Sequence, residues 1–252
     1  EYLQDKNAGN LGDYLKHFLL IKLVEKVIRD YPNSSISYIE SHAGAGVYVL
    51  QDEHWKNRNK YKKIVCADSA QWDTFERLNS KVDKDKVYYG SFVLAGKLLL
   101  ENRNLISKMV LYEYEEDNKK VFERMITASD SLLSELKPES LNIESNPEII
   151  KDKIKETKSS GSDIVICLID PYFKEGKKDS IWCEALSWDV PDLFVLMFDF
   201  VRAQGRDENK QLRFLWHCKN RTPIKKSSGI KGYAIFGNCN SEIQLEEYRS
   251  IH

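Results

Sequence analysis

The segment 170–173, Asp-Pro-Tyr-Phe, contains groups that could act on an exocyclic amine. A carboxylate and a backbone carbonyl can accept hydrogen bonds from an NH2 group, so that the nitrogen lone pair turns toward a methyl donor. Asp170 and the carbonyl of Pro171 would be these acceptors. The ring of Phe173 or Tyr172 can stack on a base taken out of its own stack. The alternative is a plain strand-ending turn, since Asp-Pro is a common turn pair.

A glycine turn and an acidic residue indicate where a nucleotide-like cofactor would bind. Residues 41–46 read Ser-His-Ala-Gly-Ala-Gly, and Glu113 follows the apolar stretch 109–112. In an open α/β sheet, ligands bind beyond the carboxyl ends of the strands, where a glycine turn lets the backbone approach and an acid accepts hydrogen bonds from ribose. A simple turn and a solvated acidic strand end are the alternative interpretations.

Hydrophobic patterns predict the elements that position these residues. Apolar residues recur at three- and four-residue spacing from 13 to 29, which predicts an amphipathic helix that Asn10 or Asp13 could cap. The continuous apolar run Ile164 to Ile169 is typical of a strand covered on both faces of a parallel sheet. Further helices are expected at 92–100 and 118–126, further strands at 35–40, 109–114, 193–200, 212–217 and 232–237, and a surface loop at 151–163. This alternation predicts an α/β fold with a mostly parallel, doubly wound sheet.

The chain is expected to form a single domain over residues 1–252 with a helical insertion at 50–87. Its 252 residues are enough to bury a substantial core. Two basic groups are candidates for phosphate contacts, and a solvated charged face explains either equally well. They are Lys56 to Lys63, near Trp55 and Tyr61, and Lys219 to Lys231, near Trp216.

The bulk properties exclude several classes of protein. No apolar run approaches the roughly 20 residues that span a bilayer, and residues 1–12 lack the order of a signal peptide. The five cysteines are scattered singly, without the Cys-x-x-Cys spacing of a zinc or redox site. We therefore expect a soluble, cytoplasmic protein without a metal, either a monomer or a weak oligomer. The net charge of −1 does not identify a partner.

Several of these segments resemble the J-type bacterial methyltransferases that modify adenine N6 in large-subunit ribosomal RNA. The matching segments are 7–17, 38–46, 89–91, Glu113 and 169–171, with a weaker likeness at 229–238. They occur in the order of the family and run through nearly the whole chain.

The resemblance implies a Rossmann-like, S-adenosylmethionine-dependent methyltransferase that acts on RNA. It implies that Asp170 is the catalytic acceptor and that Tyr2 lies near the substrate base. The residues it implies around the cofactor are Lys16, His17, His42, Gly44, Ser91, Glu113, Ser145 and Asn146.

The chain also departs from the family pattern at three places. Asp-Pro-Tyr-Phe replaces the usual Asp-Pro-Pro-Tyr, Asn7 replaces a histidine, and Ser145-Asn146 replaces an Asp-Gly expected near the cofactor adenine. Two alternatives therefore stay open. One is a DNA adenine methyltransferase, and the other is a catalytically inactive nucleic-acid-binding protein with the same fold.

Overall fold

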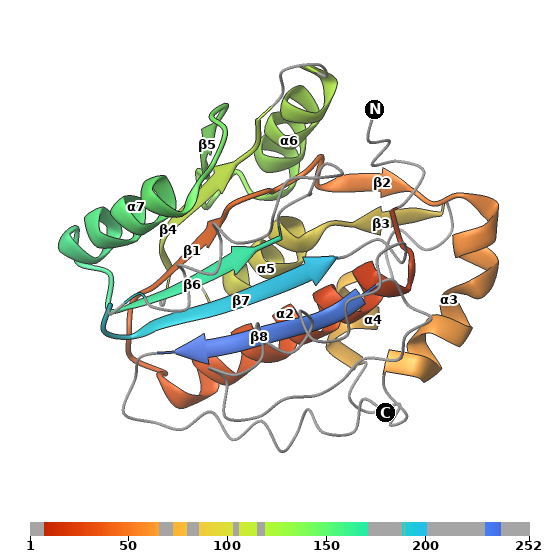
Figure 1. The fold of residues 1–252 in the computed structure, drawn as a ribbon, viewed down its shortest axis with the longest axis horizontal. Helices are drawn as coiled ribbons and strands as arrows, with labels where there is room; N and C mark the ends of the chain where they lie inside the picture. The colour runs from red at the N-terminus through yellow and green to blue at the C-terminus, as the bar shows by residue number, and fades with distance from the viewer. Residues whose placement is uncertain are drawn as a thin grey trace.

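The sheet of the computed structural model has six strands in the order β5-β4-β1-β6-β7-β8 (Figure 1). The structure describes residues 8–65, 73–79, 86–102, 106–114, 119–170, 188, 190–200 and 230–237. The strands are β1 (Ile36–Glu40), β4 (Ile106–Tyr112), β5 (Glu139–Leu141), β6 (Ile164–Ile169), β7 (Leu193–Phe200) and β8 (Ile230–Gly237). Neighbouring strands are parallel except for β8, which is antiparallel to β7. The predicted α/β class and mostly parallel sheet are confirmed.

Both faces of the sheet are covered, because successive residues of β6 belong to two different cores. Ile164, Ile166 and Leu168 pack into the larger core, with α2 (Leu11–Asp30) and α5 (Ser91–Leu100). Val165, Cys167 and Ile169 pack into the second core, with Ile150 and Ile154 of α7 (Pro147–Ser159). This double covering explains why β6 reads as an uninterrupted apolar run.

The helix α2 begins where the sequence indicated. The Asn10 side chain caps it by accepting hydrogen bonds from the backbone N–H of Gly12, at 2.6 Å, and of Asp13, at 3.2 Å. These bonds satisfy two of the amide groups that a helix leaves unpaired at its start. Asn10 therefore fixes the position of the first turn, which carries Asp13 and Lys16.

One predicted element was wrong, because residues 151–159 continue helix α7 instead of forming a surface loop. The helix starts with Asn146 as its cap, accepting from Ile149 N at 2.9 Å, and with Pro147 at its first position. Ile150 and Ile154 are buried one turn apart and hold it against the sheet. Because lysines and acids occupy most other positions of this helix, its short apolar stripe is hard to recognise in the sequence.

The segment 50–87, for which a helical insertion is predicted, contains two helices among its described residues. The helices α3 (Asp52–Val65) and α4 (Asp73–Asn79) lie between β2 (Val47–Val49) and β3 (Val87–Tyr89), which pair as an antiparallel ribbon. The helix α6 (Lys119–Leu132) is longer than predicted, and β4 ends at Tyr112 instead of residue 114. The strand expected at 212–217 lies outside the described residues. None of the described helices is long and apolar enough to cross a membrane.

Candidate active site

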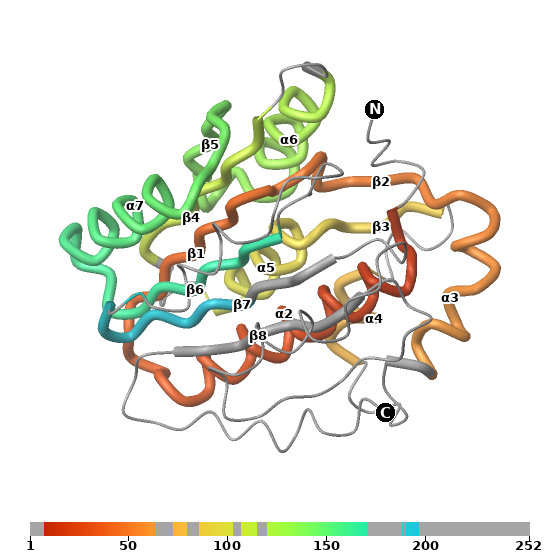
Figure 2. Tube along the Cα trace, in the orientation of Figure 1, coloured from red at the N-terminus to blue at the C-terminus, as the bar shows by residue number. Residues whose placement is uncertain are grey.

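The carboxyl ends of β4, β1 and β6 lie side by side (Figure 2). The last residue of β1, Glu40, is in register with Leu111 on one side and Leu168 on the other. Beyond it, Ser41 N donates to Leu168 O at 3.0 Å and Ala43 N donates to Tyr112 O at 2.8 Å. The turn 41–46 is therefore bonded to both neighbouring strands at the sheet edge where ligands bind in open α/β folds.

The structure brings together the two features that the sequence suggested for a cofactor. Gly44 N donates to Glu113 Oε2 at 2.6 Å, so the carboxylate is fixed against the turn. Gly44 and Gly46 have φ values of +66° and +76°, which favour glycine. The turn thus presents its backbone closely to anything bound beyond the strand ends.

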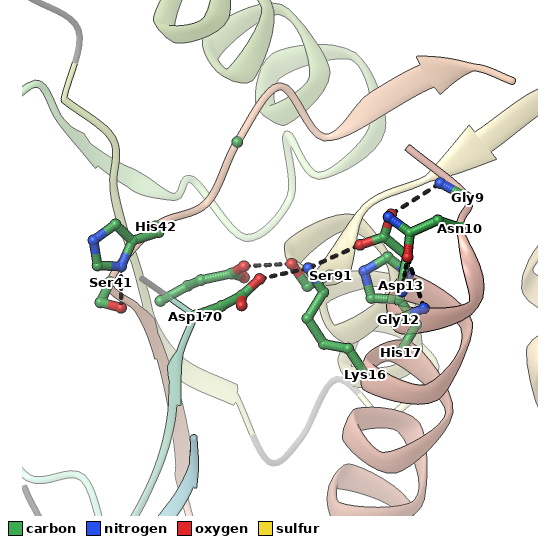
Figure 3. Close-up of polar contacts among 12 residues, drawn as sticks. Gly9, Asn10, Gly12, Asp13, Lys16, His17, Ser41, His42, Ser91 and Asp170 are labelled. Atoms are coloured by element: carbon green, nitrogen blue, oxygen red, sulfur yellow. Dashed lines mark hydrogen bonds and ion pairs between the residues drawn. The ribbon is translucent and has the colours of Figure 1, made fainter. Parts of the chain in front are cut away.

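Asp170, directly after β6, forms an ion pair with Lys16 from α2 (Figure 3). Lys16 Nζ lies 2.5 Å from Asp170 Oδ2 and 3.3 Å from Asp13 Oδ1. Asp13 Oδ2 in turn accepts from Gly9 N at 2.9 Å. Burial acts to lower the pKa of Lys16, but Asp170 and Asp13 outweigh it and hold this pKa well above its ordinary value. Lys16 is therefore a permanent cation between two carboxyl groups.

Glu40 is a buried acid at the site that the sequence analysis did not identify. Its Oε2 accepts from Tyr38 OH at 2.6 Å, and its Oε1 accepts from the hydroxyl of Ser91. Burial raises the pKa of Glu40 to about 8, against the opposing effect of these two hydrogen bonds. In the sequence, Glu40 is recognisable as an acid at the last position of a strand whose other residues are buried. Ser91, predicted to contact the cofactor, thus has a partner within the protein.

Glu40 is expected to make the protein less stable as pH rises. The folded protein keeps the proton up to about pH 8, whereas the unfolded chain loses it near the ordinary pKa of 4.5. The free energy of unfolding should therefore fall by up to about 1.4 kcal/mol per pH unit within this window. Glu40→Gln, which cannot ionise, should flatten this slope in urea unfolding between pH 5.5 and 8. The exposed Glu144→Gln is the control, and an unchanged slope in Glu40→Gln would contradict the assignment.

The two histidines that were predicted to contact the cofactor have different surroundings. His17 is 2% exposed, its Nδ1 lies 2.8 Å from Tyr88 OH, and the two rings are stacked. His42 belongs to the turn, and its Nδ1 lies 2.7 Å from Ser41 Oγ. Burial, with a smaller contribution from the charge of Lys16, lowers the pKa of His42 to about 4 and that of His17 well below its usual value. Both rings are therefore neutral at pH 7.

Ser145 and Asn146 lie near the turn and have structural partners. Ser145 Oγ donates to Ser41 O at 2.6 Å, which ties the start of α7 to the start of the turn. Asn146 is the cap of α7. The other predicted site residues, Tyr2, Pro171, Tyr172 and Phe173, and the basic group at 219–231, lie outside the described residues.

Three carboxyl groups and one ammonium group lie at this edge of the sheet. Asp13, Asp170 and Glu113 contribute carboxyl groups, and Lys16 contributes the cation in contact with the first two. Among the described residues, no group of three or more His, Cys, Asp or Glu side chains is arranged to hold a metal ion. The site therefore offers carboxylates, hydroxyls and backbone groups to a ligand.

Comparisons with known proteins agree with this fold. No protein-family model matches the chain. A solved structure of a Legionella pneumophila protein, LPL1258, described as a DUF519 protein, has a TM-score of 0.62 at 14% identity, covering 97% of this chain and 91% of that one. The chain thus has the same α/β fold as that protein, with a mostly parallel sheet.

One curated relative is similar in sequence over part of the chain. The Escherichia coli (strain K12) protein "Ribosomal RNA large subunit methyltransferase J" is 30% identical over an alignment 114 residues long, which covers 41% of this chain. The chain spans 40% of the length of that relative. The likeness is therefore confined to less than half of each protein.

Proposed function

We propose that the protein is an S-adenosylmethionine-dependent methyltransferase that modifies adenine N6 in nucleic acid, with ribosomal RNA as the favoured substrate. The observation that carries this proposal is the carboxylate of Asp170 at the end of β6, one strand away from the glycine turn that follows β1. The partial likeness to the Escherichia coli ribosomal RNA methyltransferase supports the choice of RNA. The proposed enzyme is a single domain, 1–252, cytoplasmic, and a monomer or weak oligomer.

The residues beyond β1 and β4 fit the proposed cofactor. Glu113 would accept hydrogen bonds from the ribose hydroxyls, held in place by its bond from Gly44 N. The neutral ring of His42 adds no positive charge near a sulfonium. The remaining proposed contacts are Lys16, His17, Ser91, Ser145 and Asn146.

The chemistry follows from the groups around Asp170. S-adenosylmethionine would supply the methyl group. One carboxylate oxygen of Asp170 is held by Lys16, and the carboxylate can accept an N–H of the target amine, with the carbonyl of Pro171 as second acceptor. These bonds orient the nitrogen lone pair for in-line displacement, so that positioning is the main catalytic device. Phe173 and Tyr172 would stack on the flipped base, and Tyr2 would lie beside it.

The proposal is tested by incubating the protein with labelled S-adenosylmethionine and either ribosomal RNA or genomic DNA. We expect label in N6-methyladenine of the RNA after digestion to nucleosides. Label in DNA alone would replace RNA by DNA as the substrate. Calorimetric binding of the cofactor without transfer to either polymer would favour an inactive, nucleic-acid-binding protein and would overturn the proposed activity.

A further inference from the structure

A second hollow lies outside the candidate active site, between α2 and the helical insertion. Its volume is about 160 Å³, roughly ten times what a single water molecule needs. Four aromatic side chains line it, together with two basic side chains of α3. They are Tyr14, Trp55, Phe75 and Tyr88, with Arg58 and Lys62. Tyr14, Phe75 and Tyr88 are each 3% exposed and form its floor. Its rim holds Trp55 and Arg58, together with the ion pair of Lys62 and Glu76, whose Nζ and Oε1 lie 2.6 Å apart.

The aromatic rings form a connected wall. The ring centre of Tyr14 lies 5.4 Å from that of Tyr88 and 5.6 Å from that of Phe75. The guanidinium of Arg58 lies 3.8 Å from the ring centre of Trp55, in a cation–π contact. Rings and guanidinium planes are the surfaces on which unstacked nucleobases lie in single-stranded nucleic acid complexes.

The charge of α3 complements a polyanion. The helix carries five basic residues, and both of its acids, Asp52 and Glu53, are in the first turn. Lys56, Lys60 and Lys63 are exposed, whereas Arg58 and Lys62 border the hollow. Lys62 is paired with Glu76, so Arg58 and the three exposed lysines are the cations that α3 would offer to the phosphates of a strand with one base in the hollow.

We propose that this hollow binds one unstacked nucleobase of the nucleic acid strand, next to the target nucleotide, with the adjoining phosphates on α3. This inference rests on the proposed function, because the strand bound in the hollow is the nucleic acid that the proposed enzyme methylates. Asn79, which also lines the hollow, donates to Phe75 O at 3.1 Å and accepts from Tyr89 N at 3.2 Å. Because its amide is bonded within the protein, the base is held mainly by stacking, with little preference for sequence.

Two side chains that line the hollow, Tyr88 and Tyr14, connect it to residues of the candidate active site. Tyr88, in its wall, bonds to His17, the neighbour of Lys16. Tyr14 lies on α2 between Asp13 and Lys16. A base held here would therefore bring the strand to the part of α2 that carries the partner of Asp170.

The test measures equilibrium binding of a 12-nucleotide oligoadenylate RNA and of the same backbone with abasic sites. Trp55→Ala is expected to weaken binding of the oligoadenylate by about 5- to 150-fold, the range of one lost base stack. The abasic strand should bind Trp55→Ala and the wild type equally. Trp55→Phe, which keeps a ring, should retain most of the affinity. Arg58→Ala should weaken both strands, and Lys155→Ala, an exposed lysine on α7, should weaken neither.

A second measurement uses the wild type, in case Trp55→Ala does not fold. A 5-iodouridine RNA should cross-link to rings of the hollow, identified by peptide mapping. Equal affinity of folded Trp55→Ala and wild type, or cross-links only outside the hollow, would overturn the inference. Both readouts are independent of methyl transfer. Stacking in the hollow without methyl transfer would refute only the proposed activity, and methyl transfer without stacking would refute only the hollow.

Discussion

Replacing Asp170 by alanine is expected to abolish methyl transfer, with a loss of at least about 10²-fold in kcat. Alanine removes the carboxylate that would orient the target amine. Cofactor binding should change little, because Asp170 is not among the proposed cofactor contacts, which lie on α2, α5, the ends of β1 and β4 and the start of α7. Lys16 would keep Asp13 as its partner at 3.3 Å, so the protein should still fold. Transfer of labelled methyl groups, calorimetric binding of the cofactor and thermal unfolding measure these three effects.

Asp170→Asn is the matched variant for this prediction. Its amide oxygen can still accept a hydrogen bond from the amine or from Lys16, but without the negative charge. We expect it to recover part of the activity lost in Asp170→Ala. Full activity in the alanine variant would remove Asp170 from the proposed mechanism. Loss of cofactor binding in both variants would instead assign it a role in holding the cofactor.

Replacing Gly46 by alanine is expected to reduce the free energy of unfolding by about 3 kcal/mol or more. The backbone φ of +76° is strained for any residue with a Cβ, at about 1–2 kcal/mol. The new methyl would also lie within 3.0 Å of the buried Phe92 ring and 3.2 Å from Ala128 Cβ. Such overpacking adds about 1–3 kcal/mol. Urea unfolding monitored by circular dichroism measures the loss.

Gly161→Ala separates the two causes. Gly161 also has a positive φ, +99°, but no atom lies within 4 Å of a Cβ built there. This variant should therefore show the cost of backbone strain alone and be clearly less destabilised than Gly46→Ala. If the two variants lost the same stability, the packing of the turn against Phe92 would not be what constrains Gly46.

Most of the sheet could be predicted from the sequence, because buried strands such as β6 are continuous apolar runs. Helix α7 could not, since only Ile150 and Ile154 mark its buried face among many charged residues. Its cap, Asn146, was instead interpreted through the resemblance as a cofactor contact. Local patterns thus identify elements whose burial is extensive and miss those held by a narrow stripe.

The residues of the candidate site were predicted individually, but their partners were not. The pairing of Glu113 with Gly44 follows from the adjacency of β1 and β4, a strand order that the sequence alone does not supply. The pairing of Asp13 with Lys16, and the bonds of Glu40 to Tyr38 and Ser91, depend on side-chain positions that no spacing rule supplies. The partner of His17 could not be predicted either, because Tyr88 follows the insertion, 71 residues later in the sequence.

The ion pair between Lys16 and Asp170 joins residues 154 positions apart in the chain. During synthesis, helix α2 leaves the ribosome long before strand β6 does. Because domains are made from the N-terminus onward, the carboxylate partner can reach Lys16 only after the intervening residues and β6 have been translated. A nascent chain is thus expected to lack this pair, and with it the assembled site, until β6 has left the ribosome.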